Sequence, residues 1–410
     1  MTFFTSRWVE RPEHVTELEP AALPRGFRAA GVAAGLKPDG LDVGVLVSDE
    51  PDTTSAARFT TNARLGAPVI VSQQAARERL RAVVANSGGS NTGDGRRGIE
   101  TALATRAAAA EALGVPSEQI GLASTGVIAA ELPRDRVVAG ARDAIERLGQ
   151  ESGGLARAIM TTDQWPKHAC LEVALEGGSV RLAAQAKGAG MISPRYATMF
   201  CFVETDAVLS AETVELLTGV CVKRSFDRIS VDGQLSTSDT VFVLASGASG
   251  VPVEPESPNE LRLGEAMDAL MRQLALLIVA DGEGARRVGR VVVRGADDGV
   301  ERVARSVANS PLVKTALHGA EPNYGRILQA AGQAMSGEQF LVDLHIEGHQ
   351  VVSAGEGVPL SEHELRQLEH AVRGDEVEYT LTIPGEGGET EVFFSDLSHE
   401  YVTINAEYTT

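Results

Sequence analysis

Cysteine, long apolar runs and basic residues are scarce in this 410-residue chain, and each shortage excludes a class of protein. The three cysteines, Cys170, Cys201 and Cys221, are irregularly spaced, which predicts neither a disulfide framework nor a zinc site. The longest apolar run, 274–280, is far too short to cross a bilayer. Residues 1–20 carry several charges and no apolar core, so we expect no secretory signal. These features predict a cytoplasmic protein.

The charge balance excludes polyanionic partners. Acidic residues number 56 and basic residues 37, which gives a formal net charge of −19. Nucleic acids and anionic membranes bind basic surfaces, so we expect neither as a partner. A small anionic substrate would need local cations or backbone N–H groups. This requirement draws attention to Lys187 and to the glycine-rich turns.

The pattern of apolar residues indicates an α/β fold. Aromatic residues make up only 4% of the chain and glycines number 43, which suits close packing of helices on sheets. We predict strands over 69–71, 83–85, 119–123, 240–245, 290–294 and 340–346, and helices over 98–113, 137–148 and 261–280. Gly114 and Gly149 are the expected C-caps of the first two helices. A boundary just after 281–284 predicts a domain over 1–285 and a smaller C-terminal α/β domain over 286–410.

One threonine stands in an unusual setting. Residues 187–200 read KGAGMISPRYATMF, with flexible glycines, a stiff Pro194 and a small Ala197 directly before Thr198. A mid-chain threonine has no base for its hydroxyl. If the Ala197–Thr198 bond breaks, the new α-amine, with a pKa near roughly 8, can take the hydroxyl proton. The alternative at this point is an ordinary loop threonine.

Further polar residues are candidates for a site. The turn 124–126 follows a predicted strand and can aim the Thr125 hydroxyl and the Gly126 N–H at one oxyanion, or Thr125 can cap a helix. Lys187 can meet a carboxylate, and Glu283 can meet an ammonium group. The alternatives are a solvated lysine and a loop carboxylate. Thr161 can hydrogen-bond a ligand or cap a short turn.

Metal and phosphate chemistry have no support in the sequence. His345 and His349 are four residues apart but lie in a predicted strand region, so they do not share a helix face. The turn 282–284 is followed by no Lys-Ser or Lys-Thr, which excludes a phosphate-binding loop. We therefore expect no cofactor.

Ordered motifs along nearly the whole chain resemble one family. Besides 187–200 they are NSG at 86–88, STGVI at 124–128, IMTTD at 159–163, SVDG at 230–233, ST at 236–237, DT at 239–240, DGEGA at 281–285, SPLVKTA at 310–316, EPNYGR at 321–326 and NAEYTT at 405–410. The set resembles the self-cleaving ornithine acetyltransferases (glutamate N-acetyltransferases) of arginine biosynthesis, which have an N-terminal threonine nucleophile.

The resemblance implies a layered α-β-β-α sandwich and cleavage into chains 1–197 and 198–410. It implies ping-pong transfer of acetyl from N2-acetylornithine to L-glutamate through acetyl-Thr198. Thr125 and Gly126 would form the oxyanion hole. The implied substrate contacts are Thr161, Lys187, Thr198, Glu283, Asn405 and Thr410. No metal or bound cofactor is implied, acetyl-CoA is left open as a second donor, and two copies of each cleaved chain would form a heterotetramer.

Departures from the family pattern leave the amine substrate open. They include Gly89, Gly93, Ala189, Tyr196, Phe200, Gln234 and Leu235. Three alternatives therefore stand beside the main reading. One is an N-terminal-nucleophile amidohydrolase or aminopeptidase with water as acceptor, another is an acyltransferase paralogue with a different amine substrate, and the third is an uncleaved binding protein.

Overall fold

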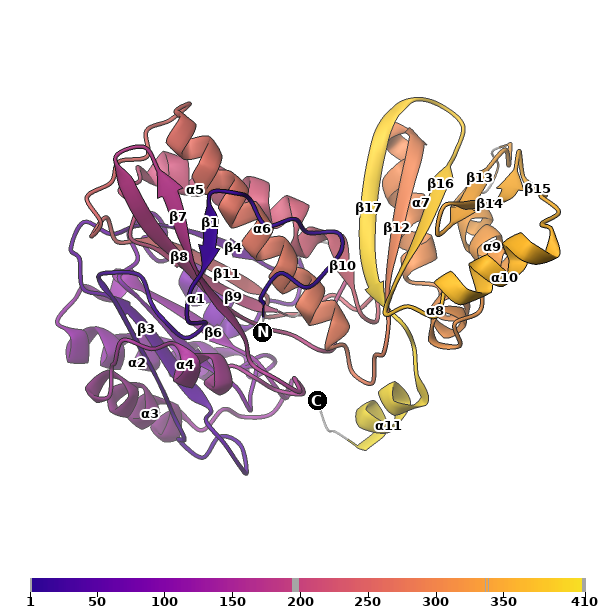
Figure 1. Ribbon diagram of the computed structural model, residues 1–410. Helices are drawn as coiled ribbons and strands as arrows, with labels where there is room; N and C mark the ends of the chain where they lie inside the picture. Colours follow the sequence, from indigo (N-terminus) through magenta and orange to yellow (C-terminus); the bar gives the residue numbers. More distant parts are fainter. Residues whose placement is uncertain (1, 194–198, 336, 338, 408–410) are drawn as a thin grey trace.

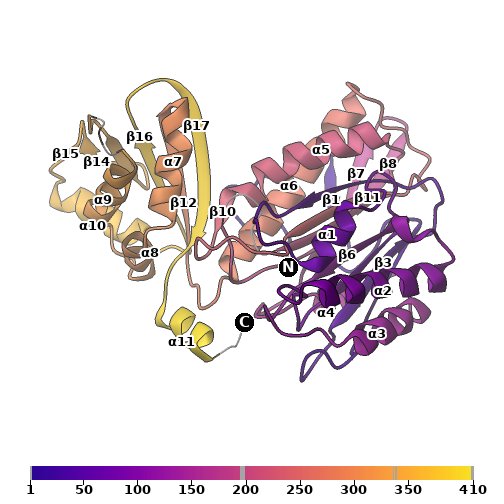
Figure 2. The ribbon, with the colours of Figure 1, turned by 180° about the vertical axis from the view of Figure 1, so that it is seen from behind.

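A four-layer α-β-β-α sandwich forms the larger lobe of the computed structural model, which describes residues 2–193, 199–335, 337 and 339–407 (Figures 1 and 2). Among these residues the larger sheet has the order β1-β7-β8-β9-β11-β4, and the smaller has the order β2-β3-β5-β6. Helices α5 and α6 cover the outer face of the larger sheet, and α1, α2 and α3 cover the smaller one. The predicted fold class is confirmed.

The elements of this lobe have the following bounds. The strands are β1 (Val15–Glu17), β2 (Phe27–Val32), β3 (Val43–Ser48), β4 (Thr54–Phe59), β5 (Ala82–Asn86), β6 (Ile120–Ser124), β7 (Lys167–Leu175), β8 (Gly178–Lys187), β9 (Phe200–Thr205) and β11 (Thr240–Ala245). The helices are α1 (Ala67–Gln73), α2 (Arg96–Leu113), α3 (Arg134–Glu146), α4 (Gly153–Ala158), α5 (Ala211–Arg224) and α6 (Pro258–Ala280), with 3-10 turns at Ser117–Gln119 and Phe226–Arg228.

Strands between the layers are apolar on both faces because both faces are buried. In β11, Val241 and Val243 pack toward α5 and α6, while Phe242 faces the smaller sheet. Phe202 of β9 also faces inward, and its ring centroid lies 6.0 Å from that of Phe242. The inner core is therefore a contact between the two sheets. Strand β9 begins shortly after Thr198 in the sequence, strand β11 begins directly after Asp239, and both strands contribute side chains to this core.

The smaller lobe has its own apolar core and a mixed sheet in the order β10-β17-β12-β16-β13-β14-β15 within the described ranges. Its strands are β10 (Ile229–Ser230), β12 (Val288–Ala296), β13 (Asp343–Ile346), β14 (His349–Ser353), β15 (Glu356–Gly357), β16 (Glu376–Thr382) and β17 (Gly387–Ser395). Its helices are α7 (Asp297–Ala308), α8 (Pro311–His318), α9 (Tyr324–Ala334) and α10 (Glu362–Ala371). Helix α11 (His399–Glu407) follows β17 and returns toward the larger lobe (Figure 1). The domain limits 1–285 and 286–410 stay a prediction.

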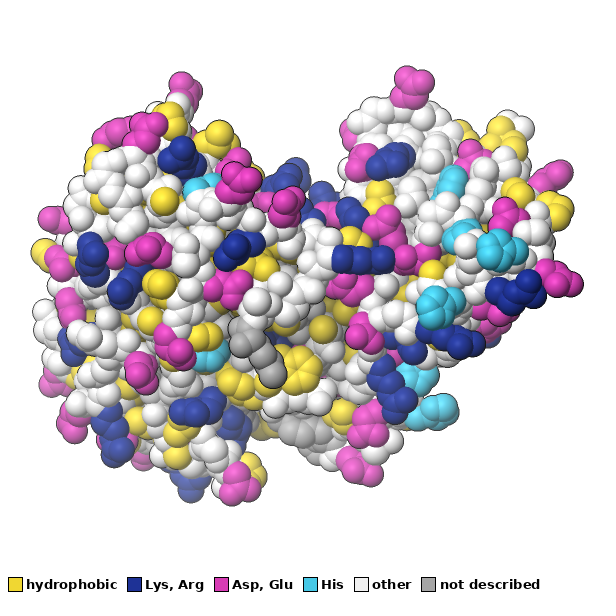
Figure 3. Space-filling view, viewed as in Figure 1, with side chains coloured by type: hydrophobic (Ala, Val, Ile, Leu, Met, Phe, Trp, Pro, Cys, Tyr) yellow, Lys and Arg dark blue, Asp and Glu magenta, His cyan; other side chains and the backbone are white. Residues whose placement is uncertain are grey.

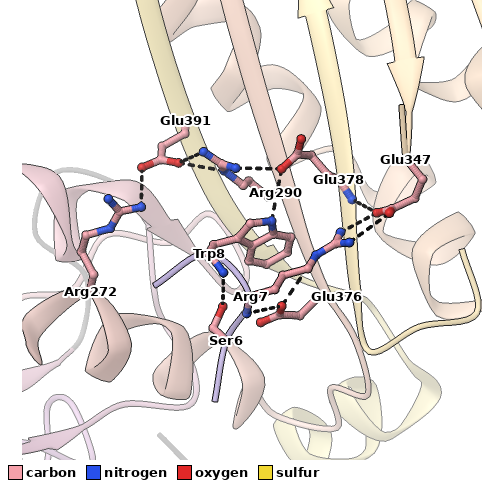
Figure 4. Close-up of polar contacts among 9 residues, drawn as sticks. All are labelled: Ser6, Arg7, Trp8, Arg272, Arg290, Glu347, Glu376, Glu378 and Glu391. Atoms are coloured by element: carbon pink, nitrogen blue, oxygen red, sulfur yellow. Dashed lines mark hydrogen bonds and ion pairs between the residues drawn. The ribbon is translucent and has the colours of Figure 1, made fainter. Parts of the chain in front are cut away.

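The N-terminal segment links the two lobes through charged side chains (Figure 4). Arg7 donates to both carboxylate oxygens of Glu347 at 3.0 and 2.6 Å. Trp8 Nε1 donates to Glu378 at 3.1 Å, and its ring lies 5.5 Å from that of Phe393. Acidic and basic side chains are mixed over the face that carries the notch between the lobes (Figure 3). The segment therefore contacts the smaller lobe before the chain enters the larger one.

The structure corrects three local expectations. Residues 69–71 lie in helix α1, not in a strand, because Pro68 starts a helix whose apolar face covers the smaller sheet. Helix α3 ends at Glu146, so Gly149 is not its C-cap; Gly149 instead pairs with Ala29 in a β-bridge. The strand expected over 340–346 begins only at Asp343.

Gly114 is left-handed at the end of α2, which confirms it as the C-cap of that helix. The three cysteines are free and buried. No helix in the described part of the chain is long and apolar enough to cross a membrane.

Candidate active site

A cavity of about 230 Å³ in the larger lobe collects most of the predicted site residues. Its lining includes Thr125, Gly126, Thr161, Lys187, Glu283 and Asn405. The first five come from segments of the larger lobe, and Asn405 comes from α11. Their catalytic and binding roles stay predictions. Ala197, Thr198 and Thr410, which complete the predicted set, lie outside the described residues, as does Tyr196.

Two interlocked turns form one wall of the cavity. The Thr125 N–H donates to the Asn86 carbonyl at 3.0 Å, and the Ser124 hydroxyl donates to Asn86 Oδ1 at 2.6 Å. Gly126 has φ +119°, and a Cβ there would lie 2.7 Å from the backbone of Gly88. Only glycine allows this approach without strain. Since the next helix starts at Arg134, the interpretation of Thr125 as a helix N-cap is wrong.

A buried lysine lies beside the Thr125 hydroxyl. Lys187 is the last residue of β8 and is only 2% exposed, which excludes a solvated surface lysine. Its Nζ donates to Thr125 Oγ1 at 3.3 Å. Burial lowers the pKa of Lys187, and the nearby Asp163 carboxylate opposes that shift. The amino group of Lys187 thus contacts the Thr125 hydroxyl, which is a candidate hydrogen-bond donor to an oxyanion.

A buried ion-pair network supports this region from behind. Asp163 accepts from Lys167 Nζ at 2.8 Å and from the Gly188 N–H at 2.7 Å. Burial alone raises the pKa of Asp163, but Lys167, Lys187 and the Gly188 N–H outweigh it and bring the pKa to about 2. Lys167 also pairs with Asp281 at 2.5 Å. The network fixes the loop that carries Thr161 to the end of β8.

Glu283 is a buried carboxylate in a fixed position. It accepts from the Thr162 hydroxyl at 2.8 Å and from Asn405 Nδ2 at 2.6 Å. Its carboxylate rests on Gly190, where a Cβ would lie only 2.5 Å from Oε1. Three segments far apart in sequence therefore meet at Glu283. Such a carboxylate suits an ammonium group of a ligand.

Sequence reasoning missed several residues around the cavity. Asp232 accepts from the N–H groups of Met191 and Ile192 at 2.6 and 2.9 Å. The Tyr401 hydroxyl donates to the same carboxylate at 3.3 Å. Asp232 lies in the motif SVDG at 230–233, so the sequence could have indicated it as a site residue. Lys167 and Tyr401 lie in none of the motifs, and nothing in the sequence indicated them.

No histidine is among the described residues that line the cavity. His345 and His349 lie on the adjacent strands β13 and β14 of the smaller lobe. Over the residues with described positions, no group of three or more His, Cys, Asp or Glu side chains is placed to hold a metal ion.

The fold and the cavity together define a class of protein. A hydroxyl, a glycine, a buried lysine and a buried glutamate around one small cavity are typical of an enzyme that stabilises an oxyanion and binds a small charged ligand.

Comparison with known proteins gives the family. The ArgJ family model matches residues 28–410, and the chain belongs to the ArgJ family. This confirms the resemblance seen in the sequence motifs.

Similar proteins are known in bacteria and archaea. The arginine biosynthesis bifunctional protein ArgJ of Nitratidesulfovibrio vulgaris is 42% identical over 397 residues, which cover 95% of this chain and 99% of the relative. The glutamate N-acetyltransferase of Methanocaldococcus jannaschii is 38% identical, over 94% of this chain and 98% of the relative. The crystal structure of ornithine acetyltransferase from Mycobacterium tuberculosis, complexed with ornithine, is 35% identical, covers 44% of this chain and 98% of that chain, and has a TM-score of 0.41.

Proposed function

We propose that this chain is a self-cleaving acyltransferase that moves acetyl from N2-acetylornithine to L-glutamate in arginine biosynthesis. The observation that carries the proposal is the convergence of Thr125, Gly126, Lys187 and Glu283 on one cavity. Family membership and the names of the curated relatives, which include a glutamate N-acetyltransferase, support the same reaction.

The charges around the cavity match N2-acetylornithine, and one of them also suits glutamate. N2-acetylornithine and glutamate each carry an α-carboxylate, for which Lys187 is the nearby buried cation. The side-chain ammonium of acetylornithine needs a carboxylate, which Glu283 supplies. Asn405 and Tyr401 of α11 close the same cavity, so the C-terminal tail takes part in recognition.

The proposed reaction has two half-reactions. Cleavage gives Thr198 a free α-amine, which takes the proton of its own hydroxyl while Oγ attacks the acetyl carbonyl. The Thr125 hydroxyl and the Gly126 N–H stabilise the oxyanion. The amide C–N bond breaks, the proton passes to the leaving ornithine nitrogen, and an acetyl ester remains on Thr198. The glutamate amine then attacks this ester and regenerates the hydroxyl.

Three finer features belong to the proposal. Acetyl-CoA is a second acetyl donor, which the word "bifunctional" in the names of several relatives supports. The enzyme works in the cytoplasm, where free buried cysteines are stable. Two copies of each cleaved chain assemble as a heterotetramer.

Ornithine release with and without glutamate tests the reaction. The proposal predicts one burst of ornithine per cleaved enzyme without glutamate and steady release with it. Steady release that does not depend on glutamate would show a hydrolase. Release that depends on another amine but not on glutamate would show a paralogue with a different substrate. A chain that stays uncut and releases no ornithine would indicate a binding protein.

A further inference from the structure

One loop holds both ends of the segment predicted to be cleaved. The loop 231–239 connects β10 to β11. Upstream of the cleavage site, Asp232 accepts from the N–H groups of Met191 and Ile192 at 2.6 and 2.9 Å. The Ile192 carbonyl in turn accepts from the Val231 N–H at 2.9 Å. This end of the segment is therefore fixed by side-chain and backbone hydrogen bonds to the first residues of the loop.

The downstream end is fixed by the last residue of the same loop. Asp239 Oδ1 accepts from the Met199 N–H at 2.9 Å, and the Met199 carbonyl accepts from the Thr240 N–H at 3.1 Å. Met199 directly follows Thr198 in the chain. Asp239 thus accepts a hydrogen bond from the N–H of the peptide bond that joins Thr198 to Met199.

The Asp239 carboxyl group is buried, with 1% of the residue exposed. Its second oxygen, Oδ2, makes no hydrogen bond of ordinary geometry in the described ranges, although the Ser236 and Thr60 side chains favour the charged form of the group. A buried carboxyl costs free energy of folding, so an apolar residue would be favoured if acceptance of the Met199 N–H were not required there. Burial raises the pKa of Asp239 well above its usual range, against the Met199 N–H, Lys187, Ser236 and Thr60.

Self-cleavage needs this kind of control. The Thr198 oxygen must attack the Ala197 carbonyl carbon, break the Ala197–Thr198 C–N bond and form an ester. Water then hydrolyses the ester and leaves an Ala197 carboxylate and a Thr198 amine. Such an attack is fast only when the reacting atoms are held at about 3–3.5 Å. The hydrogen bonds to Ile192 and Met199 hold the described residues on either side of the Ala197–Thr198 bond in place.

We propose that loop 231–239 positions the chain for self-cleavage, with Asp232 and Asp239 as its two positioning residues. This inference rests on the proposed function, because it concerns the step that creates the nucleophile. It goes further by giving a role to two aspartates that the transfer reaction does not use. The inference depends on the hydrogen bond that the Met199 N–H donates to Asp239.

Variants of the two aspartates test the proposal. The full-length chain is made as wild type, Asp239→Ala, Asp239→Asn, Asp232→Ala and Asp232→Asn, and the fraction cut is followed over time on denaturing gels and by intact mass. At position 239 asparagine keeps the one acceptor oxygen that Met199 needs, so cleavage should stay within about threefold of wild type. At position 232 asparagine keeps only one of the two oxygens that accept from Met191 and Ile192, so the Asp232→Asn rate should fall between wild type and Asp232→Ala. Alanine removes the acceptor and should slow cleavage by at least about tenfold.

A matched control separates positioning from general loss of stability. Glu204 on β9 is also a fully buried carboxyl with a raised pKa, but its hydrogen-bond partner is Gln185 and not the segment. Glu204→Gln should therefore be cut at the wild-type rate. Thr198→Ala gives the uncut baseline, and thermal unfolding shows which variants are folded.

The outcomes distinguish this inference from the proposed function. If wild type is cut between Ala197 and Thr198 and folded Asp239→Ala is cut equally fast, the inference is overturned and the function stands. If Asp239→Asn and Asp239→Ala are slowed alike, hydrogen-bond acceptance is not the cause, and the inference is also overturned. If Asp239→Ala does not fold, the Asp232→Ala variant replaces it in the test: folded Asp232→Ala that is cut as fast as wild type overturns the inference. An uncut wild type overturns the proposed function itself.

Discussion

Replacing Gly190 by alanine tests whether the fixed position of Glu283 governs substrate binding. A Cβ at residue 190 would lie 2.5 Å from Glu283 Oε1 and 2.7 Å from Oε2, whereas ordinary contact begins at 3.4 Å. The carboxylate must therefore move by about 0.9 Å. It cannot move freely, because Thr162 and Asn405 hold its two oxygens. The added methyl group should break or bend both hydrogen bonds.

The expected effect follows from the size of this shift. A displacement near 1 Å of a positioning group costs up to about 10²-fold in rate, or roughly 2.7 kcal/mol of transition-state stabilisation. We predict that kcat/KM for N2-acetylornithine falls by about 10- to 100-fold per cleaved chain, measured as ornithine release at saturating glutamate. The effect should appear mainly in KM if Glu283 binds the ground state as well as the transition state.

The matched control is Gly149→Ala, because a Cβ at Gly149 meets no atom within 4 Å. It should leave kcat/KM unchanged. If folded, cleaved Gly190→Ala enzyme also stays within about threefold of wild type, Glu283 does not recognise the substrate in the way proposed here.

Three further predictions concern stability. Gly126→Ala places a side chain at φ +119° against the backbone of Gly88, so the free energy of unfolding should fall by about 1–3 kcal/mol; an unchanged melting temperature would contradict this. Burial lowers the pKa of Lys314 to about 7, so between about pH 7 and 10 the unfolded chain binds a proton that the folded chain does not, and Lys314 contributes a rise of stability with pH over that range. Urea titrations should show a more positive slope of stability against pH in wild type than in Lys314→Met, and an equal slope in both proteins would refute the assignment. Arg7→Ala removes a half-exposed ion pair with Glu347 and should cost at most about 1 kcal/mol, less at high salt; a larger loss would show that the N-terminal segment is essential to the contact between the lobes.

Long periodic segments of the fold were predictable from the sequence, and short ones were not. The helix at 98–113 and the strand at 240–245 were predicted to within two residues of their observed bounds, because their patterns are long or flanked by clear turns. Residues 69–71 are a short apolar run, which fits a buried strand and a buried helix equally well. Pro68 at the start of α1 was the signal that favoured a helix.

The site was predictable only in part for a similar reason. Lys187 and Glu283 were candidates from their residue types, and Asn405 was found through family resemblance; the structure shows that all three line one cavity. The ion pair between Lys167 and Asp281 joins residues 114 positions apart and leaves no local pattern. Interactions of this kind depend on tertiary contacts that no window of sequence contains.

The mass of the enzyme after reaction with N2-acetylornithine alone tests the central claim most directly. The enzyme is quenched in acid before glutamate is added, and its fragments are weighed and mapped. We predict two fragments, with a single acetyl group on the first residue of the fragment that begins at Thr198, and loss of that group once glutamate is supplied. Acetyl transfer at the normal rate by an uncut chain, or an acetyl group carried on any other residue, would contradict the account.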